Sequence, residues 1–90
     1  MEFDWDFSNE AHIARHKVEP EEAEEVATDP AALNVATYRG PRGEQRFGLL
    51  GATDSGRVLV VFYELRNGKT RVVTVRDATQ TERVRYETED

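Results

Sequence analysis

The sequence predicts an α+β fold in which N-terminal helices and a C-terminal helix pack on a three- to four-stranded antiparallel sheet. Apolar residues recur at helical spacing near the N-terminus, whereas residues 45–76 are rich in β-branched and aromatic side chains. Asn67-Gly68 within that second region is a strong hairpin signal, because both residues tolerate a positive φ angle. Since 90 residues suit one small domain, we expect a single domain over residues 1–90.

Two helices are expected before the sheet. Asp6 or Ser8 can cap a first helix that runs to about His16, with a buried stripe made of Phe7, Ala11, Ala14 and Val18. Pro20 favours the first turn of a second helix, and the Asp29-Pro30 pair ends it. Its buried stripe is expected to contain Ala23, Val26 and Ala27.

An antiparallel meander and a last helix should follow. We expect strands over residues 34–38, 45–53, 57–66 and 69–76. Thr79 and Glu82 have the spacing of a capping box, so a final helix starts there and is expected to fray near Tyr86.

The turns predict the register of the sheet. A two-residue turn at Asn67-Gly68 would produce the pairs Arg66–Lys69, Glu64–Arg71, Phe62–Val73 and Val60–Val75. A three-residue turn at 54–56 would pair Arg46 with Glu64. One face would then be apolar at one end and carry the row Arg46, Glu64 and Arg71 at the other. The opposite face, with Leu59, Val61, Leu65 and Val72 and with Arg76 near one end, is the better candidate for helix packing.

The charged row has two interpretations. It can be a cross-strand salt-bridge ladder, which contributes a few tenths of a kcal/mol per exposed pair. It can also bind a phosphate, because one carboxylate between two guanidiniums leaves positive charge over and can handle a proton. The second interpretation requires that Arg46, Arg66 and Arg71 converge on one pocket.

Composition excludes several classes of protein. No apolar run approaches the ~18 residues of a membrane span, and the acidic N-terminus lacks the features of a secretory signal. The absence of cysteine excludes disulfides and thiolate metal sites and fits a reducing cytoplasm.

Charge is unevenly distributed along the chain. The net charge is −6, but residues 1–30 hold ten acids and two bases, whereas residues 31–86 hold ten bases and five acids. An overall negative charge opposes nucleic-acid binding, and the arginine-rich remainder favours a basic functional surface. His12 and His16, four residues apart on one helix, could bind a metal, but no third ligand is evident, so we expect no metal site. Tyr38, Tyr63 and Tyr86 could stack on nucleobases, although Tyr63 fits the core better.

Short motifs in a fixed order extend over most of the chain. They include Phe3-Asp4-Trp5-Asp6, Arg15-His16-Lys17-Val18, Asp29-Pro30, Glu44-Gln45-Arg46-Phe47, Gly56-Arg57-Val58-Leu59-Val60-Val61, Arg71-Val72-Val73-Thr74-Val75-Arg76 and Glu82-Arg83. With these motifs the chain resembles the BrnT family of type II toxin–antitoxin toxins, which are ribonucleases with a fold similar to RelE. The resemblance implies a BrnA-like ribbon-helix-helix antitoxin as partner, RNA as substrate, and contact with operator DNA only through the antitoxin.

The resemblance also implies which residues act on RNA. Matching positions indicate Arg46, Arg66, Arg71 and Arg76 for RNA binding and cleavage, with His16 and Glu44 as further candidates. We expect catalysis at Arg46, Arg71, Arg76 and His16 and RNA binding at Arg66, and we add the neighbouring cations Lys69 and Lys17 to the binding residues. Glu64 joins the catalytic set from the register argument. The implied reaction needs no metal or cofactor: the 2′-hydroxyl attacks the adjacent phosphate, and Glu64 or His16 accepts its proton.

A non-catalytic alternative stays open. Lys17 stands where the family usually has glycine, Thr74 stands for a serine, and the net charge is acidic for a ribonuclease. These features would fit a decayed toxin that serves as a protein-interaction module.

Overall fold

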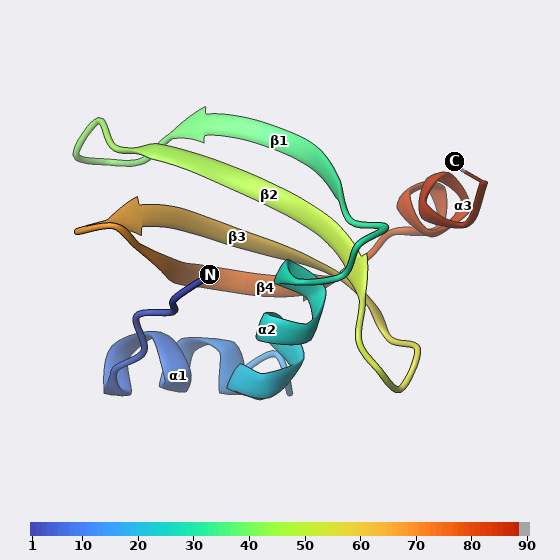
Figure 1. Cartoon of the computed structure of the whole chain (residues 1–90), viewed down its shortest axis with the longest axis horizontal. Helices are drawn as coiled ribbons and strands as arrows, with labels where there is room; N and C mark the ends of the chain where they lie inside the picture. Colours follow the sequence, from blue (N-terminus) through green and yellow to red (C-terminus); the bar gives the residue numbers. More distant parts are fainter. Residues whose placement is uncertain (89–90) are drawn as a thin grey trace.

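The computed structural model describes residues 1–88 and has the predicted α+β architecture (Figure 1). The elements in chain order are α1 (Phe7–Ala14), α2 (Pro20–Ala27), β1 (Leu33–Arg39), β2 (Gln45–Ala52), β3 (Val58–Arg66), β4 (Lys69–Asp77) and α3 (Gln80–Thr88). The strands form one antiparallel sheet in the order β1-β2-β3-β4. Helices α1 and α2 cover one face, and α3 lies at one end of the sheet. The expected fold class is therefore confirmed.

Helix α1 is capped at its N-terminus by side chains. Asp6 is its N-cap and forms a capping box with Asn9, each side chain accepting a hydrogen bond from the other residue's backbone N–H. The helix ends at Ala14, two residues before the expected His16. Its inner face is centred on Ile13, which is fully buried, whereas Phe7 is 88% exposed. The expected stripe is thus wrong at Phe7 and also at Ala14, which is exposed, because the helix turns a different side toward the sheet.

Lys17 closes α1 in a left-handed conformation, with φ of 59°. The Val18 N–H donates to Ile13 O and the Lys17 N–H to Ala14 O, which is the Schellman pattern. Val18 and Ile13 are both buried in the same cluster, so the apolar contact that accompanies this motif is also present.

Lys17→Gly is expected to stabilise the fold by about 1 kcal/mol, because glycine adopts positive φ without the steric cost that a Cβ brings. A rise in the thermal unfolding midpoint of about 4–8 °C would follow for a domain of this size. Lys17→Ala is the control, since it removes the charge and keeps the Cβ. Equal stability of the two variants would contradict the backbone argument.

The main core lies between α1, α2 and the sheet. Pro20 occupies the first turn of α2, and the helix buries Ala23, Val26 and Ala27 as expected. Ala23 and Val26 pack with Leu59 and Val61 of β3 and with Val72 and Val75 of β4. Gly51 of β2 allows the close approach of α2, because a Cβ there would lie 3.1 Å from both Val26 Cγ1 and Val26 O.

The observed register agrees with the expected one between β2 and β3 and next to the β3–β4 turn. Farther from that turn, the pairing of β3 with β4 shifts by one residue. Arg46 pairs with Glu64, Glu64 with Arg71, and Arg66 with Lys69. A β-bulge beside Phe62 and Tyr63 then pairs Phe62 with Thr74 and Val60 with Arg76, so the expected pairs Phe62–Val73 and Val60–Val75 are wrong. The extra residue turns Val75 into the main core and moves Arg76 to the face that carries Val60.

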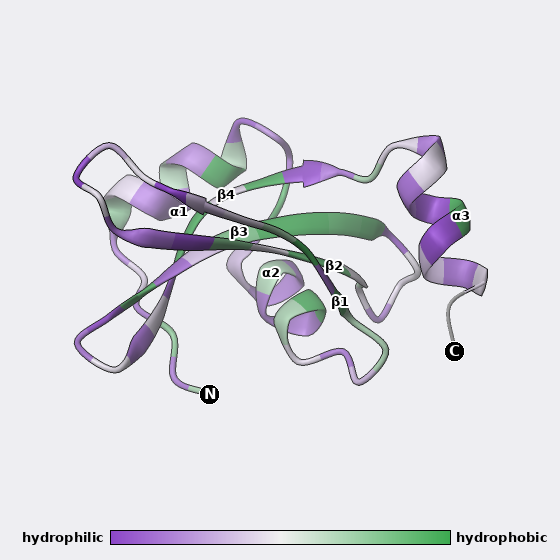
Figure 2. Cartoon of the chain, turned by 90° about the horizontal axis from the view of Figure 1, so that it is seen from above, coloured by the Kyte–Doolittle hydropathy of each residue, from purple (hydrophilic) through white to green (hydrophobic). Residues whose placement is uncertain are grey.

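A smaller apolar cluster occupies the second face near α3. Leu50, Val58 and Val60 are buried there, and Ala78 and Tyr86 pack against them. Tyr86 lies within α3, which continues to Thr88, so the expected fraying at this residue is wrong. Figure 2 shows hydrophilic residues on the strands at the opposite end of the sheet, where the β1–β2 and β3–β4 turns lie.

Candidate functional site

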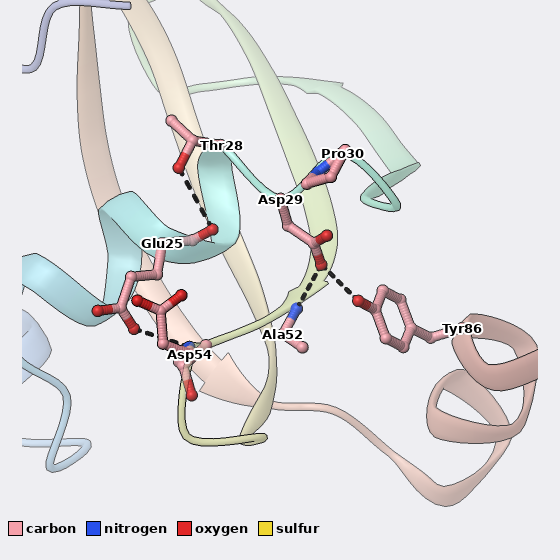
Figure 3. A pocket seen from close by; sticks show the side chains of 8 residues that line it. Glu25, Thr28, Asp29, Pro30, Ala52, Asp54 and Tyr86 are labelled. Atoms are coloured by element: carbon pink, nitrogen blue, oxygen red, sulfur yellow. Dashed lines mark hydrogen bonds between the residues drawn. The ribbon is translucent and has the colours of Figure 1, made fainter.

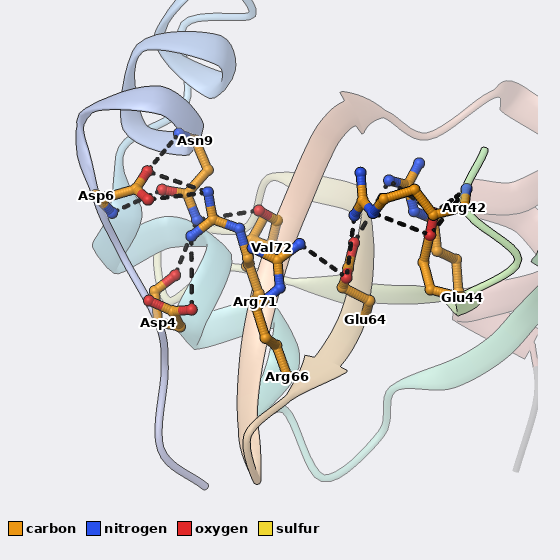
Figure 4. A network of polar contacts seen from close by, with 10 residues as sticks. Asp4, Asp6, Asn9, Arg42, Glu44, Glu64, Arg66, Arg71 and Val72 are labelled. Carbon is orange, nitrogen blue, oxygen red and sulfur yellow. Dashed lines mark hydrogen bonds and ion pairs between the residues drawn. The ribbon is translucent and has the colours of Figure 1, made fainter. Parts of the chain in front are cut away.

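One buried carboxylate contacts three arginines at the end of the sheet that carries the β1–β2 and β3–β4 turns, here called the turn end (Figure 4). Glu64 of β3 has a side chain only 6% exposed, and its oxygens lie 3.4 Å from Arg46 Nη2, 3.2 Å from Arg66 Nη2 and 3.8 Å from Arg42 Nη2. Glu44 adds a second carboxylate, 3.4 Å from Arg46 Nη2 and 3.5 Å from Arg42 Nε. We call these five residues the arginine cluster; with three guanidiniums and two carboxylates, it keeps one positive charge.

Arg46 is the most enclosed cation of the arginine cluster, with a side chain 16% exposed. Its Nη2 contacts both carboxylates, but its Nε is buried and has no hydrogen-bond partner in residues 1–88. A buried donor without a partner is unusual, because such a group costs free energy. Gly40 keeps the space around this side chain, since a Cβ at Gly40 would lie 2.7 Å from Arg46 Nε.

Glu44 is held in its ionised form by its neighbours. Burial alone would raise its pKa, but backbone N–H groups and the cations Arg42 and Arg46 outweigh that effect, so the pKa lies below its usual value. Glu44 is therefore a carboxylate at neutral pH and pairs with both arginines.

Arg71 does not join the arginine cluster, so the expected convergence of Arg46, Arg66 and Arg71 on one pocket is wrong for this residue. Although it is the register partner of Glu64, its guanidinium turns to the N-terminal segment, 3.0 Å from Asp6 and 3.6 Å from Asp4 (Figure 4). The hydrogen bond between Arg71 and Asp6 raises the pKa of Arg71 and lowers the pKa of Asp6. A parallel bridge between Phe3 and Thr70 brings this segment alongside β4, and no local sequence signal predicts that pairing.

Arg76 lies on the same face as the arginine cluster, not on the helix-packing face as expected, because the bulge reverses its side. Its guanidinium carbon lies 5.5 Å from the centroid of the Phe62 ring. It also forms two hydrogen bonds with Glu82 of α3, of 2.7 and 3.0 Å. Arg76 therefore ties α3 to the sheet.

The Arg76–Glu82 pair should make the attachment of α3 depend on pH. The hydrogen bond from Arg76 is the main cause that lowers the pKa of Glu82 to about 2. Because the pKa of Glu82 is lower in the folded chain than in the unfolded chain, the pair contributes its full stability above the ordinary carboxyl pKa. This contribution is lost as pH falls toward about 2. We expect Glu82→Gln to be less stable than the parent at neutral pH and equally stable at about pH 2. Thermal unfolding of both proteins over this range tests it, and a difference that does not change with pH would contradict it.

The remaining predicted site residues do not contact the carboxylates of the arginine cluster. Lys69 is the register partner of Arg66 at the β3–β4 turn, but its Nζ lies 3.7 Å from Glu2. His16 and Lys17 follow α1, whose core residue Ile13 packs on the opposite face of the sheet. The rings of His12 and His16 are 5.8 Å apart, and His12 Nε2 lies 3.0 Å from Thr74 Oγ1. Among residues 1–88, no group of three or more His, Cys, Asp or Glu is arranged to hold a metal ion.

A polar cavity of about 380 Å³ lies at the other end of the sheet, between α2, the β2–β3 turn and α3 (Figure 3). Asp29 is central to it and accepts hydrogen bonds from Tyr86 Oη, Ala52 N and Ala31 N. Burial raises the pKa of Asp29, but these hydrogen bonds outweigh it and lower the pKa overall, while the bond to Asp29 raises the pKa of Tyr86 to about 12. The Asp29 carboxylate thus joins the loop after α2, the end of β2 and α3, whereas the sequence alone had suggested only that Asp29 ends α2.

A family of known proteins matches most of the chain. Residues 5–82 match the family model described as ribonuclease toxin, BrnT, of type II toxin-antitoxin system. No curated protein matches the chain. None of the helices within residues 1–88 has the length and apolar character needed to cross a bilayer.

Proposed function

The chain belongs to the BrnT family of type II toxin–antitoxin ribonuclease toxins, and on this premise we propose that it cleaves RNA at the arginine cluster without a metal ion. Membership in this family implies an antitoxin partner and an RNA target. The observation that supports this location is the buried carboxylate of Glu64, which holds three guanidiniums side by side.

Binding of a phosphate would exploit the mobility of the outer arginines. The Arg42 side chain is 62% exposed, and its contact with Glu64 is long, at 3.8 Å. Because such an exposed ion pair is weak, the guanidinium can move to a phosphate oxygen at little cost in free energy. Guanidiniums bind phosphate through paired N–H groups, and Arg42 and Arg66, whose side chains are 62% and 41% exposed, can supply them. Their charge would stabilise the negative charge that grows on the phosphate oxygens in the transition state.

The proposed reaction is an internal transfer of the phosphoryl group. The RNA 2′-hydroxyl gives up its proton, its oxygen forms a bond to phosphorus, and the bond from phosphorus to the 5′-oxygen breaks. The departing 5′-oxygen takes a proton from solvent, so the products are a 2′,3′-cyclic phosphate and a 5′-hydroxyl. Of the two candidate proton acceptors, Glu64 is the one beside the arginines, because His16 lies after a helix on the other face. We assign Glu64 as the acceptor, reached when phosphate draws Arg42 and Arg66 outward.

Neighbouring cations would extend the binding surface along the RNA. Arg66 and Lys69 pair at the end of the hairpin, and Arg71 and Arg76 lie at further positions of β4. Each of the last two is held by its own carboxylates, so a phosphate must compete with Asp6 or Glu82 for it. We assign all four residues to the binding of phosphates that flank the cleaved one.

The proposed partner is a BrnA-like ribbon-helix-helix antitoxin in the cytoplasm. We assign contact with operator DNA to the antitoxin, and contact with RNA to this chain. Repression of the operon would therefore proceed through the DNA-binding antitoxin.

The direct test is incubation of the purified chain with RNA in EDTA. We expect cleavage products that end in a 2′,3′-cyclic phosphate and no cleavage where the scissile nucleotide is 2′-deoxy. Glu64→Gln keeps the size of the side chain and should reduce cleavage by about 100-fold or more. Intact RNA after incubation with the parent chain would reject the ribonuclease and leave the non-catalytic interaction module.

A further inference from the structure

Aromatic side chains lie next to the arginine cluster on the same face of the sheet. Tyr38 is the register partner of Arg46, and its ring meets Phe62 edge-on with centroids 6.1 Å apart. Phe62 lies across Gly48, where a Cβ would be 3.0 Å from the ring. The guanidinium of Arg76 lies over the Phe62 ring. We call Tyr38, Phe62 and Arg76 the stacking platform.

Tyr38 is the open part of the stacking platform, whereas Phe62 is half-buried against the smaller apolar cluster. Helices α1 and α2 pack on the opposite face, and α3 with Tyr86 packs near Leu50 and Val58, away from the turn end. Tyr38 is 39% exposed, although a tyrosine ring gains from burial. A planar group could therefore lie on this ring without displacing any element.

We propose that the stacking platform binds an unpaired nucleobase of the RNA while the arginine cluster binds the phosphate next to it. The proposal rests on the proposed ribonuclease function and adds a substrate class, single-stranded RNA. Aromatic rings interleaved with guanidiniums are the combination that binds single strands, because the bases stack and the phosphates pair. Bases inside a duplex are stacked on one another and cannot reach such a ring.

Charge favours a nucleic acid over a protein as the occupant. Arg42, Arg46, Arg66 and Arg76 border the stacking platform, against the carboxylates of Glu44, Glu64 and Glu82. This surface is positive on a chain whose net charge is −6. A polyanion with planar groups complements both features.

The experiment measures binding of two fluorescent oligonucleotides by anisotropy. One is a single-stranded 2′-O-methyl RNA, which cannot be cleaved because its 2′-oxygen is blocked, and the other has the same backbone with abasic sites. The full chain should bind the base-bearing strand more tightly. Tyr38→Leu should weaken that binding about tenfold and leave abasic binding unchanged, whereas Tyr38→Phe should retain it. Phe7→Leu is the matched control, because this exposed ring lies on α1.

The outcomes separate the platform from the chemistry. Equal binding of the two strands, an equal loss in Phe7→Leu, no detectable binding of the base-bearing strand, or tighter binding of duplex RNA would each overturn the proposal. So would a Tyr38→Leu variant that loses affinity for the antitoxin and not for RNA. Failure of the parent chain to cleave RNA in EDTA, with Tyr38-dependent binding retained, would reject the proposed catalysis and support the platform.

Discussion

Replacement of Arg46 by alanine is expected to lower the rate of RNA cleavage about 100- to 1000-fold, the loss seen when one preorganised donor to a transition-state oxyanion is removed. The expected effect is large because Arg46 is the least exposed cation of the arginine cluster and is fixed by both Glu44 and Glu64. Its orientation is therefore set before substrate binds, which gives charge stabilisation without the cost of ordering a mobile side chain.

Initial cleavage rates in EDTA would measure this effect, with two further variants for comparison. Arg46→Lys should recover part of the activity, because lysine keeps the charge and loses the forked donor geometry. Arg57→Ala makes the same chemical change at the opposite end of the sheet, where Arg57 pairs with Glu22 and Asp77, and should cleave at the parent rate once folded. Full activity in Arg46→Ala, or an equal loss in Arg57→Ala, would be inconsistent with the assignment.

Elements set by local signals were predictable from the sequence. The Asn67-Gly68 turn has both residues at positive φ, and the Thr79–Glu82 capping box is formed by two hydrogen bonds. Both depend on residues within four positions of each other, so no tertiary information is needed. The register near the turns followed from them, and with it the Arg46–Glu64 neighbourhood.

Features set by distant contacts were not predictable. The bulge near Val73 has no glycine or other local marker, yet it moves Arg76 from one face to the other. Likewise, Arg71 could pair with Glu64 by register, but the N-terminal segment supplies two carboxylates that the turn geometry does not reveal. The sequence therefore predicts which residues are cationic on the sheet better than which carboxylate each of them contacts.

The role of Asp29 was also beyond the reach of sequence analysis, although its position was not. Asp29-Pro30 correctly marks the end of α2, since the residue before proline is disfavoured in a helix. Its carboxylate, however, joins three parts of the chain: the start of the loop at Ala31, the end of β2 at Ala52, and Tyr86 of α3. Only the folded structure shows that one side chain fastens all three.

Asp29→Ala is accordingly expected to lower the free energy of unfolding by about 3 kcal/mol, because hydrogen bonds to a charged group are each worth about 1.5–3 kcal/mol and the N–H of Ala52 loses its acceptor. Tyr86→Phe removes a single O–H and should cost about 1 kcal/mol. Urea unfolding of the two variants beside the parent measures both values. Equal losses would mean that Asp29 acts through Tyr86 alone.

A titration at alkaline pH separates these two contributions. The pKa of Tyr86 is raised to about 12 in the folded chain by its hydrogen bond to Asp29. Its share of the stability is therefore complete below the ordinary tyrosine value of about 10 and disappears as pH rises toward about 12. The parent should lose stability over this interval, and Tyr86→Phe should lose less. If the free energy of unfolding of the parent fell in parallel with that of Tyr86→Phe, the hydroxyl of Tyr86 would add nothing to the attachment of α3. The larger cost of Asp29→Ala would then have to come from the lost hydrogen bond to the backbone of β2.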